Sequence, residues 1–309
     1  MSLIAAICTN RSPAAVRPAL AEVCAQAAAA PGVAVLLVTS GLPDADHGTH
    51  ADAAERLGAR ALAAPAGLSS ARNLALAEAE GVAGAELIAF VDDDALPAEG
   101  WLARLLERWA RAAPEVACIG GAILPRWERP PPAWLGEGLH SAFSLLDLGD
   151  GVVELDPILG SDAWGANISF RVAAACEAGG FDPARGAWVG LPLFGDESAL
   201  QRRLAERGYR VLYAGDVRVE HLVGAERMRL RELWRRELWR GVSAFLDGRA
   251  SPARGAAAAL KACAGVLVAL ARRDWPLAGE RFARAGRGAG AAAAPLLTRR
   301  LRRRGWPGR

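Results

Sequence analysis

The sequence predicts an α/β fold in which a mostly parallel sheet is flanked by helices and followed by a helical extension. Short apolar runs alternate with helical patterns along the N-terminal part of the chain, which is the pattern of βαβ units. After residue 223 the pattern is helical only. We therefore expect a globular domain over residues 1–223, made of halves at 1–100 and 101–223, and a helical extension over 224–309.

Each expected strand is a buried apolar run bounded by turn residues. These runs lie at 3–8, 33–38, 60–63, 87–91, 116–124, 165–171, 210–213 and 217–219. The expected helices lie at 14–30, 51–57, 101–112, 199–207 and 230–245, and one more starts near residue 69. Residues 126–160 are irregular, and their Trp127, Trp134 and Phe143 either line a substrate groove or pack the loop onto the domain.

The composition is that of a globular protein with ample core material. Hydrophobic residues make up 52% and charged residues 23% of the 309 residues, and the net charge of +3 is too small to indicate nucleic-acid binding. The five cysteines form no CxxC pair, which argues against a disulfide framework or structural zinc and favours reduced thiols in a cytosolic protein. We expect no signal peptide and no transmembrane helix, the nearest candidate being the apolar run at 256–271.

Three adjacent carboxylates, Asp92, Asp93 and Asp94, follow the apolar run at 87–91 and are called the acidic triplet below. Like charges at a strand end repel, so their proximity needs compensation. A divalent cation such as Mg²⁺ or Mn²⁺, holding a diphosphate on its other side, would supply it. The alternative is a polar loop whose aspartates cap the helix that begins near Trp101.

Polar residues also follow the first two strands. Thr9, Asn10 and Arg11 come after the first strand, and Thr39 and Ser40 come after the second. The carboxyl ends of parallel strands meet at one edge of a sheet, where ligands bind in such folds. We therefore expect these side chains to share a crevice with the acidic triplet.

Two later features have both a functional and a bland interpretation. Asp196 and Glu197 occupy the first turn of a helix, where the helix dipole favours carboxylates in any protein. His221 stands at a strand end, and a histidine there is more often structural than a metal ligand.

In this order the segments resemble family 2 glycosyltransferases of the GT-A fold, over residues 3–221. The resemblance is carried by residues 8–11, by the helix start Ala71-Arg72-Asn73, by the acidic triplet as a DxD motif, by 165–171 and 179–182, and by 195–197 with His221. Each motif alone is weakly specific, whereas six of them in one order are a strong signal.

The resemblance implies an inverting transfer of a sugar from a nucleotide-diphosphate donor, with a divalent metal, Mn²⁺ or Mg²⁺, stabilising the leaving diphosphate. It assigns the metal to Asp92, Asp94 and His221, and the acceptor side to Trp164, Gly165 and Asn167. The donor-binding residues it implies are Thr9, Asn10, Arg11, Ser40, Asp44, Arg72, Asn73, Asp92 and Asp93, of which Asp93 points away from its neighbours and has a structural role.

The sequence departs from the family at two places. The acidic pair is usually Glu-Asp with Asp as the base, and this chain has Asp196-Glu197. We favour Glu197 by position, and Asp196 is the choice by residue type. The family's nucleotide-recognising acid is absent at Thr39-Ser40, and Asp44 is its nearest substitute. We expect uridine only because it is the commonest donor base.

Two alternatives stay open: a nucleotidyltransferase of related fold and a non-catalytic nucleotide-sugar-binding protein. The expected acceptor is a glycan or a lipid-linked acceptor, and no nucleic acid is expected. The chain is expected in the cytoplasm, with peripheral contact to an anionic membrane at its inner face as one interpretation of the helix at 230–245 and the arginine-rich tail at 299–309. The other interpretations are packing of that helix on the domain and a solvated tail.

Overall fold

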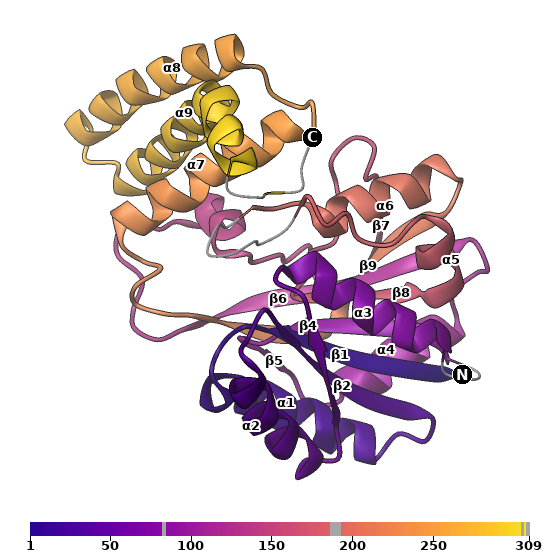
Figure 1. The fold of residues 1–309 in the computed structure, drawn as a ribbon. Coiled ribbons are helices and arrows are strands. Elements are labelled where there is room, and N and C mark those ends of the chain that lie inside the picture. The colour runs from indigo at the N-terminus through magenta and orange to yellow at the C-terminus, as the bar shows by residue number, and fades with distance from the viewer. Residues whose placement is uncertain (82–84, 186–192, 304–305, 307–309) are drawn as a thin grey trace. The chain divides into compact units, whose positions relative to one another are not determined.

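The computed structural model describes residues 1–81, 85–185, 193–303 and 306, so most of the last six residues of the arginine-rich tail lie outside the described part (Figure 1). The chain forms two compact units. The first comprises residues 1–125, 146–189 and 196–222, and the second comprises 126–145, 190–195 and 223–309. The segment 126–145 thus clusters with the C-terminal helices.

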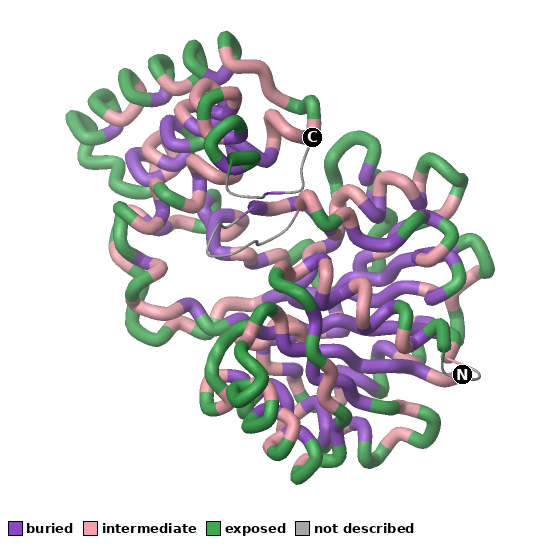
Figure 2. The backbone as a smooth tube through the Cα atoms, in the orientation of Figure 1, coloured by how far each residue is buried: buried purple, intermediate pink, exposed green. Residues whose placement is uncertain are grey.

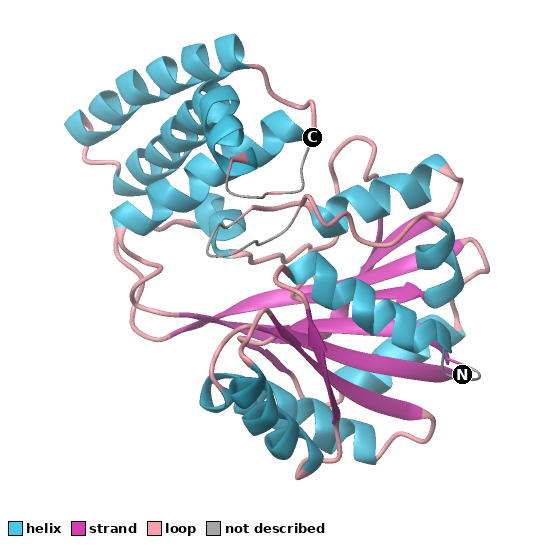
Figure 3. Ribbon diagram, viewed as in Figure 1, coloured by secondary structure: helices cyan, strands magenta, loops and turns pink. Residues whose placement is uncertain are grey.

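The first unit is built on a sheet of nine strands among the described residues, in the order β3-β2-β1-β4-β8-β6-β9-β5, with β7 beside β9 (Figure 3). The strands are β1 Ser2–Thr9, β2 Val33–Ser40, β3 Arg60–Ala64, β4 Ala85–Asp92, β5 Ala95–Pro97, β6 Val116–Trp127, β7 Val152–Leu155, β8 Asn167–Arg171 and β9 Arg210–Val223. The α/β prediction is confirmed, and buried residues run along the central strands (Figure 2).

The sheet is mixed and not mostly parallel as expected, because it is parallel only over its first four strands. Strands β1 to β4 pair in parallel, because each is joined to the next through a helix on the sheet face. Strand β8 then inserts antiparallel between β4 and β6. The two short strands expected at 210–213 and 217–219 are one continuous strand, β9, whose His221 pairs with Ala95 of β5.

The helices of the first unit are α1 Pro13–Ala28, α2 Asp44–Glu55, α3 Leu68–Gly81, α4 Trp101–Ala110, α5 Val172–Glu177 and α6 Asp196–Glu206. Helix α3 packs on the sheet through Ala71, Ala75 and Ala79, all fully buried. Small side chains let this helix approach the sheet closely, and they bring its first turns over the end of β4.

The second unit consists of the 3₁₀ helix η1 Glu137–Phe143 and the helices α7 Leu230–Leu246, α8 Pro252–Ala271 and α9 Trp275–Arg302. The Trp234 and Phe282 rings lie 5.2 Å apart, so the apolar face of α7 packs on α9. Trp127 and Phe143 meet edge to face at 6.2 Å, which supports the packing interpretation for these loop aromatics.

Helix α8 corrects one expectation. It extends over 20 residues and contains an 18-residue window with a mean hydropathy of 1.5, so by length and composition it is long enough and apolar enough to cross a membrane. The sequence prediction that no run reaches this length was wrong, because the helix begins four residues before the apolar run at 256–271. Only 17% of that window is buried.

Candidate active site

The acidic triplet and His221 lie together at the turn between β4 and β5. Asp92 is the last residue of β4, and Asp94 lies in the turn that leads into β5. The antiparallel pairing of β5 with β9 places His221 opposite Ala95, and its Nε2 lies 3.1 Å from Asp94 Oδ1. The Leu222 N–H donates to the Asp94 carbonyl at 2.8 Å, which fixes this turn.

The ligand atoms of Asp92, Asp94 and His221 all lie within 4.8 Å of one another. Two carboxylate oxygens and one imidazole nitrogen suit Mn²⁺, and the carboxylates suit Mg²⁺ as well. The three residues come from the end of one strand, from a turn and from a distant strand. They fit a divalent cation by position and by donor type.

Asp93 is not in this group and has partners of its own. Thr9 Oγ1 donates to Asp93 Oδ2 at 2.5 Å, and the same hydroxyl accepts from the Arg11 N–H at 3.0 Å. Burial, and then the neighbouring charge of Asp94, raise the pKa of Asp93 to about 6. Arg11 Nη1 lies 3.5 Å from Asp93 and 3.4 Å from Asp94, so one exposed cation serves two acids.

A second group of charges is centred on Arg72, whose side chain is only 3% exposed. Its guanidinium lies 2.9 Å from Asp196, 3.4 Å from Asp92 and 3.7 Å from Glu197. Below it lie the rings of Phe90 and Phe181, at 5.8 and 5.6 Å from the guanidinium carbon. A buried arginine with this many acidic partners stays charged and ties β4 to the start of α6.

The two acids at the start of α6 differ in surroundings. Asp196 is 2% exposed and also accepts from Ser69 Oγ at 3.2 Å. Burial alone would raise its pKa, but the charge of Arg72 and the hydrogen bonds hold the pKa below its usual range. The Glu197 side chain is 18% exposed, and burial together with the charge of Asp196 raises its pKa well above 4.5.

Gly165 makes room for Arg72. A Cβ at this position would lie 2.2 Å from Arg72 Nη2, well inside van der Waals contact. The backbone of the segment before β8 therefore approaches the guanidinium at a distance that only glycine permits. Trp164, beside it in the chain, is half-buried.

Two residues predicted to contact a ligand, Asn73 and Asn167, instead form hydrogen bonds within the protein. Asn73 accepts from the Phe181 N–H at 2.8 Å and donates to the Phe181 carbonyl at 2.7 Å. Asn167 is buried, donates to the carbonyls of Ala122 and Val217, and accepts from the Trp101 indole. Both amides hold backbone segments in place around the site.

The remaining predicted donor contacts lie at the ends of β1 and β2. Asn10 and Asp44 are exposed, and Asp44 is the first residue of α2. Ser40 Oγ accepts from the Gly67 N–H at 2.9 Å and donates to the Gly67 carbonyl at 3.0 Å. Ser40 therefore ties the end of β2 to the start of α3.

No role at the site was predicted for Ser69 and His50. Ser69 Oγ donates to Asp196 Oδ2 at 3.2 Å and to the Arg185 carbonyl at 2.8 Å. His50 is 1% exposed, and its Nε2 lies 2.9 Å from the Arg11 carbonyl, so it holds the loop that carries Arg11. The one signal for His50 in the sequence was a histidine within a short, polar segment, and its burial is seen only in the structure.

Comparison with known proteins finds matches to glycosyltransferases. Residues 4–135 match the model of glycosyl transferase family 2. A glucosyl-dolichyl phosphate glucuronosyltransferase of Haloferax volcanii is 26% identical over 159 residues, which are 51% of this chain and 50% of that protein. A pre-mycofactocin glycosyltransferase of Mycobacterium tuberculosis is 32% identical over 187 residues, which are 60% of this chain and 34% of that protein. The chain thus spans half or less of the length of these relatives.

Among solved structures, a mannosyltransferase from Pyrobaculum calidifontis in complex with GDP-Man and Mn²⁺ is similar to this chain with a TM-score of 0.55. The match covers 95% of this chain and 86% of that one at 18% sequence identity. A likeness at this identity shows the fold, and the expected GT-A fold is confirmed.

Proposed function

Residues 4–135 of this chain belong to glycosyl transferase family 2, and from that premise we propose that the protein is a metal-dependent, inverting glycosyltransferase that uses a nucleotide-diphosphate sugar. The observation that carries the proposal is the placing of Asp92, Asp94 and His221 within 4.8 Å of one another at the end of β4. A divalent cation bound there would neutralise the charge that develops on the leaving diphosphate.

We assign the donor diphosphate to the metal side of the triplet and the rest of the nucleotide to the strand ends beside it. Thr9, Asn10 and Arg11 follow β1, which is parallel to β4 and paired with it. Arg11 already lies 3.4 Å from Asp94, so its exposed guanidinium can shift to a phosphate once a cation occupies the triplet. The proposed base is uridine, with Asp44 as its recognising acid.

Glu197 is the proposed catalytic base. An acceptor hydroxyl attacks well only when a group takes its proton, and a carboxylate with a raised pKa is suited to this role. Asp196 is enclosed by Arg72 and Ser69, whereas Glu197 is the more exposed side chain and has its pKa raised by burial and by the charge of Asp196. We therefore assign Asp196, with Arg72, to positioning Glu197.

The role proposed for Arg72 differs from the donor contact that the family resemblance implied. The side chain of Arg72 is 3% exposed, and three acidic partners already compensate its positive charge, so it is poorly placed to bind a ligand. We propose that Arg72 fixes the distance between the metal side and the base side of the site. Trp164, half-buried beside Gly165, is the proposed acceptor-side contact.

The proposed acceptor is a glycan or a lipid-linked molecule, and the proposed place of action is the cytoplasmic face of a membrane. The Haloferax relative is named for glucosyl-dolichyl phosphate, a lipid phosphate, which supports a lipid-linked acceptor. The exposed apolar helix α8 supports contact between the helical unit and a membrane.

The direct test is a turnover screen. The purified full chain is incubated with UDP-, GDP-, ADP- and dTDP-sugars, with and without Mn²⁺, and release of the nucleoside diphosphate is measured with and without added glycan and lipid-phosphate acceptors. We expect release that needs both Mn²⁺ and one donor. A parallel incubation contains a nucleoside triphosphate and a sugar phosphate. Release of pyrophosphate there, with no nucleoside diphosphate released from the nucleotide sugars, would instead show a nucleotidyltransferase.

A further inference from the structure

Helix α8 buries its small residues and exposes its large ones. Gly255, Ala262 and Ala269 are its buried residues, whereas Leu260, Leu267 and Val268 are 74%, 70% and 51% exposed. A helix that packs in a water-soluble protein shows the opposite arrangement. Figure 2 shows exposed backbone along most of α8.

The exposed side of α8 is apolar over the whole length of the helix. Between Pro252 and Ala271 only Arg254 and Lys261 are charged. The exposed apolar residues are Ala253, Ala256, Ala257, Ala258, Leu260, Cys263, Ala264, Leu267, Val268, Leu270 and Ala271, and together they are called the α8 face. The α8 face itself contains no charged residue.

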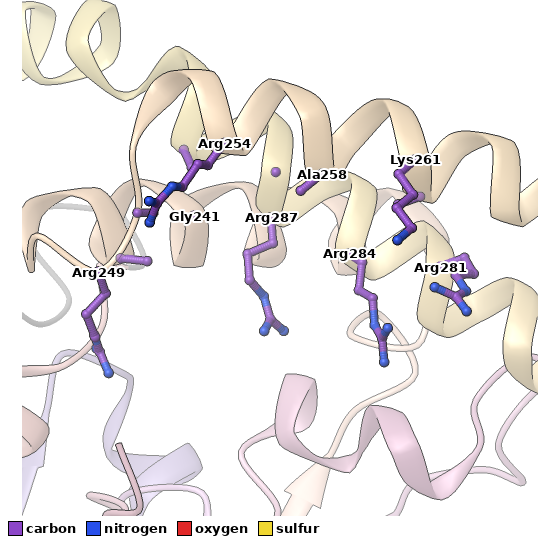
Figure 4. Close-up of a pocket in the computed structure, with 14 residues that line it drawn as sticks. Gly241, Arg249, Arg254, Ala258, Lys261, Arg281, Arg284 and Arg287 are labelled. Carbon is purple, nitrogen blue, oxygen red and sulfur yellow. The ribbon is translucent and has the colours of Figure 1, made fainter. Parts of the chain in front are cut away.

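Cationic side chains line a groove along one side of the α8 face. The groove has a volume of about 500 Å³, and its charged residues are Arg249, Arg254, Lys261, Arg281, Arg284 and Arg287 (Figure 4). Arg254 and Lys261 are seven residues apart, so they project from the same side of α8. Figure 4 shows the arginines of α9 extending toward the same groove.

Half of these cations have acidic partners. Arg249 pairs with Asp247 at 2.5 Å, Arg287 with Glu237 at 2.6 Å, and Arg284 with Glu280 at 3.9 Å. Arg254, Lys261 and Arg281 have no ion pair within the part of the chain that the structure describes. Residues 251–303 hold eleven basic residues and only two acidic ones, Asp274 and Glu280. The groove therefore has unneutralised positive charge.

We propose that the α8 face and this groove form a docking surface for a bilayer of anionic phospholipids. The leucines of the α8 face enter the boundary between headgroups and acyl chains, and Arg254, Lys261 and Arg281 bind lipid phosphates beside them. An apolar helical face flanked by lysine and arginine is the arrangement of a helix that lies in the membrane interface. The inference deepens the membrane contact proposed above and does not depend on sugar transfer.

The surroundings of α8 favour a helix that lies on the membrane over one that crosses it. The α8 and α9 backbones are in close contact, since a Cβ at Gly255 would lie 2.8 Å from the Gly288 carbonyl oxygen. If α8 spanned the bilayer, α9 would carry Arg281, Arg284 and Arg287 into the hydrocarbon, where charged side chains are costly. With α8 in the interface, the same arginines remain at the level of the phosphates.

The test is flotation of the full chain with vesicles. One set contains phosphatidylglycerol and phosphatidylcholine in equal parts, and the other contains phosphatidylcholine alone. We expect partition into the anionic vesicles that falls with added salt, and weak partition into the neutral ones. Leu260→Glu with Leu267→Glu, and separately Arg254→Glu with Lys261→Glu, should each lower partition into anionic vesicles by roughly tenfold or more.

Two control variants make the same chemical changes elsewhere. Leu159→Glu alters a leucine that is 85% exposed in the first unit, and Arg17→Glu alters an exposed arginine on α1. Both should partition as the unchanged protein does. Equal partition of the α8 variants and the unchanged protein would overturn the proposal, as would binding that resists alkaline carbonate, which would show a helix that crosses the bilayer.

The Mn²⁺-dependent binding of a nucleoside diphosphate in solution, followed by the melting temperature, separates this inference from the proposed activity. The α8 variants should keep that binding unchanged, which also shows that they fold. Loss of vesicle binding with intact diphosphate binding supports the docking surface. Absence of diphosphate binding in every variant, with vesicle partition as expected, would count against the proposed activity alone.

Discussion

Arg72 Nη1 lies 2.9 Å from Asp196 Oδ2, and both side chains are almost completely buried. This pair leaves the adjacent Glu197, 18% exposed, as the more accessible acid at the start of α6. The two acids stand here in the order Asp-Glu, the reverse of the usual Glu-Asp. The greater exposure of Glu197 supports the proposal that the acid in the second position is the base.

Replacement of the two acids should therefore have different effects. Glu197→Gln should lower kcat by roughly a hundredfold or more, because the proton of the acceptor hydroxyl has no acceptor, and should keep donor binding. Asp196→Asn should lower the free energy of unfolding by roughly 3 kcal/mol, because it removes the charge that faces a buried guanidinium. Steady-state kinetics and chemical denaturation measure the two. Loss of turnover in Asp196→Asn alone, at unchanged stability, would transfer the role of base to Asp196.

The pH dependence of kcat should report Glu197. A base acts only when it is deprotonated, so kcat should fall as the pH is lowered through the raised pKa of this group, well above 4.5. The residual kcat of Glu197→Gln should lack this limb. An acid limb that survives in that variant would assign it to another group.

Substitution of Gly165 tests the contact between the β8 segment and Arg72. A Cβ there would meet the guanidinium, so Gly165→Ala should lower the free energy of unfolding by about 1–3 kcal/mol and reduce turnover. Gly151→Ala is the matched control, since a Cβ at Gly151 has no heavy atom within 4 Å. Thermal melting and kinetics of the two variants should differ, and equal effects would show that Arg72 can move aside.

The contribution of Asp93 to the stability of the metal-free protein should fall as the pH rises from about 4 to 6. The folded-state pKa of Asp93 is raised to about 6 from a reference of 3.8, so the folded chain binds this proton more tightly than the unfolded chain does. The associated stability is fully present below 3.8 and is lost as the pH passes through about 6. Asp93→Asn should flatten this part of the melting-temperature profile. An unchanged profile would assign the dependence elsewhere.

The sequence could predict the parts of the fold and site that depend on local pattern. Alternating strands and helices predicted the α/β class, and the acidic triplet lies at the end of β4 as expected, with Asp92 as the last residue of that strand. The resemblance to a family added His221, which pattern alone left as structural.

Other features depend on contacts between distant segments, and no local pattern shows these. His221 reaches Asp94 only because β9 is one strand paired with β5, whereas the sequence suggested two short strands. The amides of Asn73 and Asn167 are satisfied by backbone groups 108 and 45–50 residues away. The membrane contact proposed for α8 depends on which of its sides packs on α9, and composition alone does not determine that.

The central claim is that Asp92, Asp94 and His221 hold a divalent cation that binds the donor diphosphate, and thermal melting with UDP and Mn²⁺ tests it most directly. The unchanged protein should show a rise in melting temperature that needs both Mn²⁺ and UDP, or GDP if the base differs. Asp94→Ala and His221→Ala should abolish that rise, while Asp52→Ala, an exposed aspartate on α2, should keep it. A rise that persists in Asp94→Ala would contradict the claim.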